Sequence, residues 1–153
     1  MTAILIVAHA PLATALLAVA RHVYPDCAAG LAAVDIEAGV SPEVAEAALQ
    51  EALARFAGRD VLILSDVFGA TPCNVAMQVA DGVHVRVVTG ANVPMLWRTL
   101  CYTEEPLEGL VSRAIAGASQ GVMQVAVPRP QNQNQNPSTA AAHHDQVQRT
   151  HQQ

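Results

Sequence analysis

His9 and Asp66 are the two residues of this chain whose types and positions best suit nucleophilic chemistry. His9 ends the apolar run Ile4–Ala8, and Asp66 closely follows a second apolar run, Val61–Leu64. Runs of this length are typical of buried parallel strands. Open α/β sheets bind their ligands at the carboxyl ends of such strands. If the two strands are neighbours, an imidazole and a carboxylate meet at one edge of the sheet.

A carboxylate beside an imidazole prepares that ring for attack. When the carboxylate accepts a hydrogen bond from Nδ1, it selects the tautomer whose Nε2 carries a free lone pair. The same carboxylate stabilises the cation that forms when Nε2 is substituted. Asp66 would therefore make His9 a nucleophile.

The residues expected around this pair favour binding of an anion. Helices are expected to begin after His9, near Thr71 and near Pro94, and each helix start offers unpaired N–H groups and a partial positive charge. Thr71 adds a hydroxyl donor, and Gly69 permits close approach of the backbone. Together these features predict a phosphoryl group carried on His9.

Each of these residues also has an ordinary structural interpretation. A histidine at a strand end is commonly a turn residue, and Asp66 could only end a strand and cap a turn. Thr71 could be a plain helix cap, and Asn92 a plain turn residue. Met95 could belong to the core. His22 and His84 are interpreted as a helix-face residue and an ordinary strand residue.

The composition limits the class of protein. The chain has 153 residues, 52% of them hydrophobic, which suits one domain with a buried core. A net charge of −5, only 3% aromatic residues and no basic stripe argue against a nucleic-acid partner. The apolar runs are too short to span a bilayer, and no leader pattern is recognised. Three scattered cysteines, Cys27, Cys73 and Cys101, indicate free thiols in a reducing cytoplasm rather than a disulfide framework.

Strand-like and helix-like segments alternate along the chain, which predicts a single-domain α/β fold with a mainly parallel sheet and helices on both faces. The expected strands are Ala3–Ala8, Leu31–Ile36, Asp60–Ser65, Val83–Val88 and Val122–Val127. The expected helices are Pro11–Tyr24, Pro42–Phe56, one from Thr71 to about Asp81, one from near Pro94, and Leu107–Ala118.

The composition changes after this region. Residues 129–153 are rich in Gln, Asn and His and cannot bury enough apolar surface to order themselves, so we expect a disordered tail after a domain of residues 1–128. His143, His144 and His151 could bind metal weakly, but a solvated tail is the favoured interpretation. No cluster has metal-ligand spacing, and no phosphate-cradling glycine motif is found, so neither metal nor cofactor is expected.

Three segments carry a resemblance to a known family. They are Ile4–His9, Ser65–Asn74 (SDVFGATPCN) and Thr89–Leu96 (TGANVPML). In order and spacing they are similar to the mannose-type enzyme IIA family of the phosphoenolpyruvate-dependent sugar phosphotransferase system, over residues 1 to about 127.

The resemblance implies roles for individual residues. It makes His9 the phosphorylated residue, Asp66 its orienting partner and Thr71 a residue of the phosphoryl site. It places Asn92, Pro94 and Met95 along the same sheet edge, facing partners. Phe68 and Ala70 stand where many family members have Trp and Gly.

The resemblance also implies partners. The donor would be the phosphocarrier protein HPr and the acceptor a IIB protein, with membrane association only through a IIC/IID complex. A homodimer is implied, in which Val122–Val127 can pair antiparallel with the partner subunit. Because the sequence continues into a Gln/Asn-rich segment, no fused IIB domain is expected.

Two other functions remain open. One is a regulatory module that uses the phosphorylation state of His9 as a switch and has no transport role. The other is a flavodoxin-like ligand binder or a histidine-dependent hydrolase, against which the missing phosphate-cradling loop and missing second base both count.

Overall fold

The fold was analysed in a computed structural model that describes residues 1–127. Met1–Met123 form one compact unit. The proposed tail at residues 129–153 and the domain boundary at residue 128 lie outside the described residues, so both stay predictions.

Four strands and five α-helices alternate along this unit, with two short 3₁₀ turns between them. The strands are β1 (Ala3–His9), β2 (Leu31–Ile36), β3 (Val61–Ser65) and β4 (Val85–Thr89). The helices are α1 (Leu12–Val23), α2 (Pro42–Ala54), α3 (Thr71–Val79), α4 (Val93–Thr99) and α5 (Leu107–Gln120). The 3₁₀ turns are η1 (Cys27–Gly30) and η2 (Leu100–Tyr102).

Local signals explain several of these boundaries. The side chain of Ser41 caps α2 by accepting a hydrogen bond from the Val44 N–H, as expected for Ser before Pro at a helix start. β4 begins two residues later than predicted. The reason is Asp81, whose Oδ1 accepts hydrogen bonds from the N–H groups of Val83, His84 and Val85 and so holds this segment in a turn.

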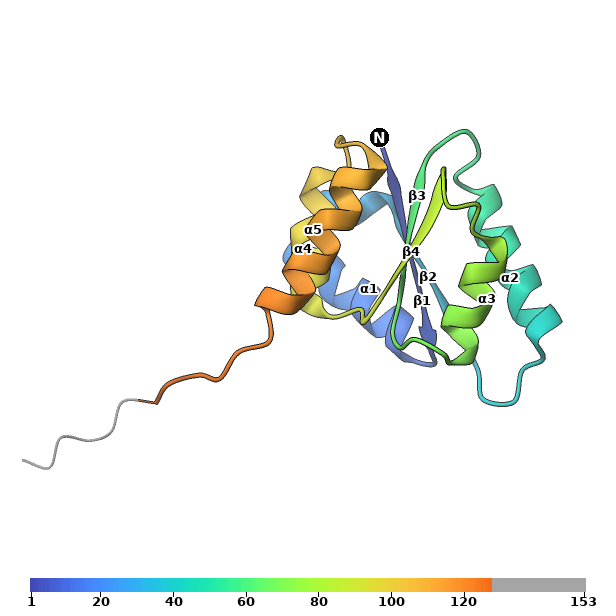
Figure 1. Cartoon of the computed structure of the whole chain (residues 1–153), viewed down its shortest axis with the longest axis horizontal. Helices are drawn as coiled ribbons and strands as arrows, with labels where there is room; N and C mark the ends of the chain where they lie inside the picture. The colour runs from blue at the N-terminus through green and yellow to red at the C-terminus, as the bar shows by residue number, and fades with distance from the viewer. Residues whose placement is uncertain (128–153) are drawn as a thin grey trace, which may run out of the picture. The chain divides into compact units, whose positions relative to one another are not determined.

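The sheet is parallel throughout and is covered on both faces (Figure 1). Helices α1, α4 and α5 pack on one face, against alternate strand residues such as Ile4, Ile6 and Leu64. Helices α2 and α3 pack on the other, against Leu5 and Ile63 among others. The predicted α/β class, the parallel sheet and the two helical layers are confirmed.

The strand order β2-β1-β3-β4 creates a topological switch point. From β1 the chain crosses to β2 through α1 on one face, whereas from β3 it crosses to β4 through α3 on the opposite face. The helices after β1 and β3 therefore lie on opposite faces of the sheet, and open α/β sheets bind ligands outside the carboxyl ends of strands at such a point. His9 ends β1 and Asp66 directly follows β3.

The predicted last strand is wrong for this chain. Val122–Val127 form no strand in the described residues, and the side chains of Val122 and Met123 are 78% and 70% exposed. An isolated strand has no partner for its N–H and C=O groups. The sheet therefore ends at β2 on one side and β4 on the other, with no antiparallel strand.

The expectation of three free cysteines is also wrong. Cys27 in η1 and Cys101 in η2 form a disulfide, with their Cα atoms 5.4 Å apart, and only Cys73 is free. The two residues are separated by 74 positions. Nothing in that spacing indicates a pair, because only the packing of α1 beside α4 brings η1 and η2 together.

Close approach of α5 to α4 depends on glycine. A methyl group at Gly117 would lie 2.6 and 2.7 Å from Cγ and Cβ of Arg98 and 3.1 Å from the Pro94 carbonyl oxygen. One turn later, Gly121 faces the Pro94 ring in the same way. These two positions let the helices pack backbone to side chain with no intervening Cβ.

Among residues 1–127, no helix is both long enough and apolar enough to cross a bilayer.

We expect Gly117→Ala to lower the free energy of unfolding. Overpacking against α4 costs about 1–3 kcal/mol, which outweighs the gain of about 1 kcal/mol in helix propensity. Gly109→Ala is the matched control, since it lies in the same helix and its methyl group would meet only the Glu105 side chain, at 3.2 Å from Oε2, and no part of α4. Urea denaturation should show Gly117→Ala below wild type and Gly109→Ala equal to it or above it. The reverse order would contradict this account of the α4–α5 contact.

Candidate functional site

His9 and Asp66 lie together at the carboxyl edge of the sheet. The ring Nδ1 of His9 is 2.6 Å from Asp66 Oδ2, and the His9 main-chain N–H donates to the same oxygen at 3.0 Å. The Asp66 side chain is only 11% exposed, whereas that of His9 is 52% exposed. The carboxylate is thus sheltered, while the ring it holds faces solvent.

The charge of Asp66 decides the tautomer of His9. Burial raises the pKa of the Asp66 carboxyl, but hydrogen bonds from the His9 main chain and ring and from the Val67 N–H outweigh burial and hold the pKa below its ordinary value. An ionised carboxylate can only accept hydrogen bonds, so Nδ1 must carry the proton. The other ring nitrogen, Nε2, is left with its lone pair.

Main-chain hydrogen bonds join the loops around this pair. The Ala10 N–H donates to the Ile36 carbonyl, which ties the turn after β1 to the end of β2. The N–H groups of Gly90 and Ala91 donate to the carbonyls of Asp66 and Ser65, which ties the turn after β4 to the end of β3. Main-chain hydrogen bonds therefore connect the loops at the edge of the sheet that carries His9.

The loop from Asp66 to Ala70 leads into α3 and contains two of the predicted residues. Gly69 has a φ of +84°, a left-handed conformation that favours glycine, and its carbonyl accepts a hydrogen bond from the side chain of Asn74. Thr71 is the first residue of α3, and its side chain is exposed. Sequence reasoning did not assign a role to Asn74, although it lies within the quoted motif.

The three helix starts predicted as anion sites are not equivalent. At α1, the Thr14 N–H and hydroxyl donate to the carboxylate of Asp35, so a negative charge already occupies that end. At α4, the Met95 N–H donates to the Asn92 side chain. Of these three helix starts, α3 is the one at which no side-chain oxygen accepts a hydrogen bond from the first-turn N–H groups. The positive end of α3 is thus the one that remains open to an anion.

The predicted residues at the start of α4 have structural roles. Asn92 caps α4 and also donates from Nδ2 to the Ala118 carbonyl of α5. Pro94 packs against Gly121. Met95 is fully buried in the core, so the expectation that it faces a partner is corrected, and the alternative interpretation of core packing holds for it.

A second histidine–aspartate pair was missed in the sequence. His84 is not a strand residue but lies in the turn before β4, where its Nδ1 is 2.9 Å from Asp60 Oδ1. The hydrogen bond to Asp60 raises the pKa of His84, and the charge of Asp81 adds to it. This pair lies at the amino ends of β3 and β4, the opposite edge of the sheet from His9.

Exposed apolar side chains lie in the segments that follow His9 and Asp66. Phe68 and Val67, in the loop after Asp66, are 72% and 50% exposed, and Leu12 at the start of α1 is 39% exposed. Exposed apolar groups beside a reactive residue are typical of a protein-binding surface. Within residues 1–127, no group of three or more His, Cys, Asp or Glu side chains could hold a metal ion.

Fold and site together define an open α/β protein with an exposed histidine, hydrogen-bonded to an aspartate, at the switch point of its sheet. A family model described as "EIIA-man: PTS system fructose IIA component" matches residues 3–115. The chain therefore belongs to the mannose-type IIA family of the sugar phosphotransferase system, whose members are phosphotransfer proteins, and the resemblance of the three motifs is confirmed.

Solved structures agree with this assignment. The mannose/sorbose-specific IIA subunit of Enterococcus faecalis is 25% identical, with a TM-score of 0.77, over 84% of this chain and 97% of that one. The phosphotransferase component EIIA of Streptococcus agalactiae is 24% identical, with a TM-score of 0.73, over 81% and 97% of the two chains, and it supports the fold. Among curated proteins, no sequence gives a significant match.

We expect the pKa of Asp66 to contribute a pH dependence to stability. Because the folded pKa lies below the unfolded value of about 3.9, the contribution is present above that value and is lost as the pH falls through the folded pKa. Asp66→Asn should therefore be less stable than wild type at pH 7, and the difference should shrink below pH ~4. Chemical denaturation at several pH values measures this. A difference that stays constant down to acid pH would contradict it.

Proposed function

We propose that this protein is a phosphocarrier that accepts a phosphoryl group from phospho-HPr on Nε2 of His9. The observation that carries the proposal is the 2.6 Å contact between His9 Nδ1 and the ionised Asp66, on a ring whose side chain is 52% exposed. The family supports phosphotransfer in general, and the geometry supports His9 as the residue that performs it.

The proposed transfer requires a nucleophile, a carboxylate that orients it and hydrogen-bond donors for the phosphoryl oxygens. Nε2 attacks phosphorus, the new N–P bond forms as the N–P bond to the donor breaks, and no proton has to move. Nδ1 keeps its proton, and Asp66 offsets the positive charge of the phosphorylated ring. The uncapped start of α3, the Thr71 hydroxyl and the open backbone at Gly69 are placed to receive the phosphoryl oxygens. Catalysis is then mostly positioning and charge stabilisation.

The alternation of β1 directs His9 toward α3. His9 has the same parity as Leu5 and Val7, which pack on the α2–α3 face of the sheet. The α1 start on the other face is filled by Asp35. This favours binding of the phosphoryl group at the start of α3 over binding at the start of α1. The sequence alone had suggested both helix starts, together with that of α4, as anion sites.

The phosphoryl group would leave to a IIB protein in sugar uptake, or would act as a regulatory signal when no IIB acceptor is present. The proposed setting is the cytoplasm, and the proposed assembly is a homodimer. A IIB protein added to the labelled carrier distinguishes the two uses: transfer of label favours transport, and retention favours regulation.

The central test is label transfer from phosphoenolpyruvate through enzyme I and HPr. Wild type should gain one acid-labile phosphoryl group, and His9→Ala should gain none. Asp66→Asn should be labelled about 10- to 100-fold more slowly, because it loses the charge that orients and stabilises the ring. His84→Ala is the matched control and should be labelled like wild type, since His84 also has a carboxylate on Nδ1 but lies at the far edge. Label that persists in His9→Ala would remove His9 from the mechanism.

Partner docking can be tested separately from chemistry. Phe68 is exposed and makes little contribution to the core, so Phe68→Ala should leave folding unchanged. We expect it to raise the HPr concentration needed for half-maximal rate by about tenfold, as for a central aromatic contact, with the rate at saturation unchanged. Val83→Ala, which removes an exposed apolar side chain at the opposite edge, is the control. Equal effects of the two variants would contradict docking over Phe68.

A further inference from the structure

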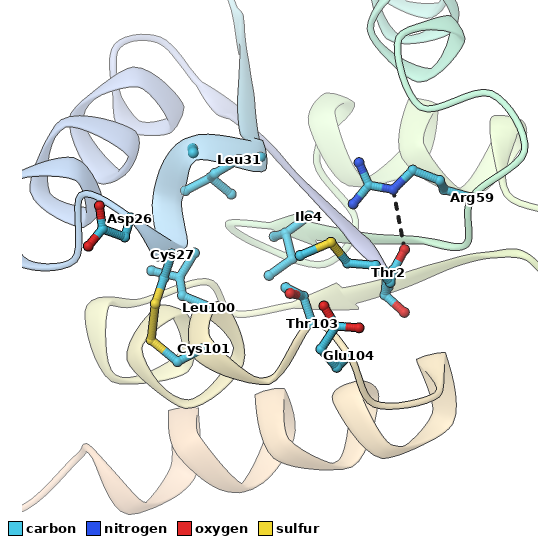
Figure 2. Close-up of a pocket in the computed structure, with 13 residues that line it drawn as sticks. Thr2, Ile4, Asp26, Cys27, Leu31, Arg59, Leu100, Cys101, Thr103 and Glu104 are labelled. Carbon is cyan, nitrogen blue, oxygen red and sulfur yellow. Dashed lines mark hydrogen bonds between the residues drawn. A yellow bond between two sulfur atoms is a disulfide. The ribbon is translucent and has the colours of Figure 1, made fainter.

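A cavity of about 570 Å³ opens at the amino ends of the strands, on the opposite edge of the sheet from His9. Its apolar wall includes Ile4, Leu31 and Leu100. The disulfide between Cys27 and Cys101 forms another part of its lining (Figure 2). This bond is the feature of the cavity that the phosphocarrier function leaves unexplained.

The disulfide connects the far ends of two helices that begin near the phosphoryl site. α1 starts just after His9 and ends shortly before Cys27, and α4 starts just after Asn92 and ends shortly before Cys101. Tyr24 and Trp97 add an edge-to-face aromatic contact between the same two segments, with ring centroids 6.3 Å apart. Closure of the bond therefore fixes α1 to α4 at the end remote from His9.

Both sulfur-bearing residues can be reached from solvent. Cys101 is exposed and Cys27 is partly exposed, whereas Cys73 is buried. The Cα separation of 5.4 Å lies within the ordinary disulfide range of about 4.4–6.8 Å, so the bond can form without rearrangement of η1 or η2. Accessible disulfides undergo thiol–disulfide exchange more readily than buried ones.

We propose that Cys27 and Cys101 are a reversible oxidation site that acts as a redox-controlled clamp on α1 and α4. In the opening reaction, a thiolate of a dithiol reductant attacks Cys101 Sγ, the S–S bond breaks, and Cys27 leaves as a thiolate. The second thiol of the reductant then attacks the mixed disulfide and releases Cys101. The reductant ends as a disulfide, and the protein gains two electrons and two protons. Glutathione disulfide or a comparable disulfide oxidant closes the pair by the reverse route.

The two cysteines are 74 positions apart, and β2, α2, β3, α3, β4 and α4 lie between them. The bond itself joins only η1 to η2, at the ends of α1 and α4. Opening it leaves η2 attached near its end by the hydrogen bonds from Thr2 to the carbonyls of Thr103 and Glu105. We therefore expect local loosening of α1 and α4 rather than loss of the fold.

The redox step is tested on the full chain without mutation. The protein is equilibrated in glutathione buffers from fully reduced to fully oxidised. It is then denatured in the presence of a maleimide, which labels free thiols, and its intact mass is measured by mass spectrometry. We expect three labels in reduced buffer and one, on Cys73, in oxidised buffer, with the change reversed when the buffer is exchanged. One label in every buffer would show a permanent bridge, and three in every buffer would show no bridge; either result overturns the proposal.

Hydrogen exchange tests the clamp. Peptides from α1 and α4 should exchange several-fold faster in the reduced protein, while those from α2, on the other face of the sheet, should not change. Cys101→Ser should exchange like the reduced protein in both buffers. Equal exchange of α1 and α4 in the two redox states would overturn the clamp.

A final measurement, which rests on the proposed phosphocarrier function, compares label transfer to His9 in the two redox states. We expect slower transfer in the reduced protein, because the helices that flank the site are less firmly positioned. Equal rates would break the link between the clamp and His9. Absence of label in both states would count against the phosphocarrier function, while mass and hydrogen exchange would still decide the redox proposal.

Discussion

The hydrogen bond between His9 Nδ1 and the Asp66 carboxylate is the interaction on which the site depends. It joins residues 57 positions apart, and it exists because β1 and β3 pair in parallel with Val7 opposite Ser65. That register places the end of one strand beside the first residue after the other. Because the chain reverses its winding direction between these two strands, the helices that follow them separate and leave the imidazole exposed.

A histidine held by a carboxylate does not by itself make a phosphoryl site, and the comparison with His84 shows why. In both His84 and His9, Nδ1 contacts an aspartate and the side chain is exposed. Beside His84 stands a further carboxylate, Asp81, whose charge opposes a bound anion. Beside His9 the chain provides the uncapped start of α3. The electrostatic surroundings, more than the pair itself, distinguish the two positions.

At the opposite edge of the sheet, a disulfide and several hydrogen bonds join the segments to one another. The Cys27–Cys101 disulfide and the Thr2 hydrogen bonds hold η1, η2 and the start of β1 together around the cavity. α1 and α4 run between the two edges of the sheet, so each helix begins at the edge that carries His9 and ends near the disulfide. This arrangement is the physical basis for the coupling proposed between thiol oxidation and His9.

The sequence by itself determined the alternation of strands and helices, the parallel sheet and the residues of the His9–Asp66 site, because these follow from local apolar runs, caps and short motifs. It could not determine contacts between distant segments. The Cys27–Cys101 bond, the capping of α1 by Asp35 and the pair of His84 with Asp60 all join residues that only packing brings together. The sequence predicted a last strand at Val122–Val127, yet a strand needs a neighbour, and the described residues of this chain provide none.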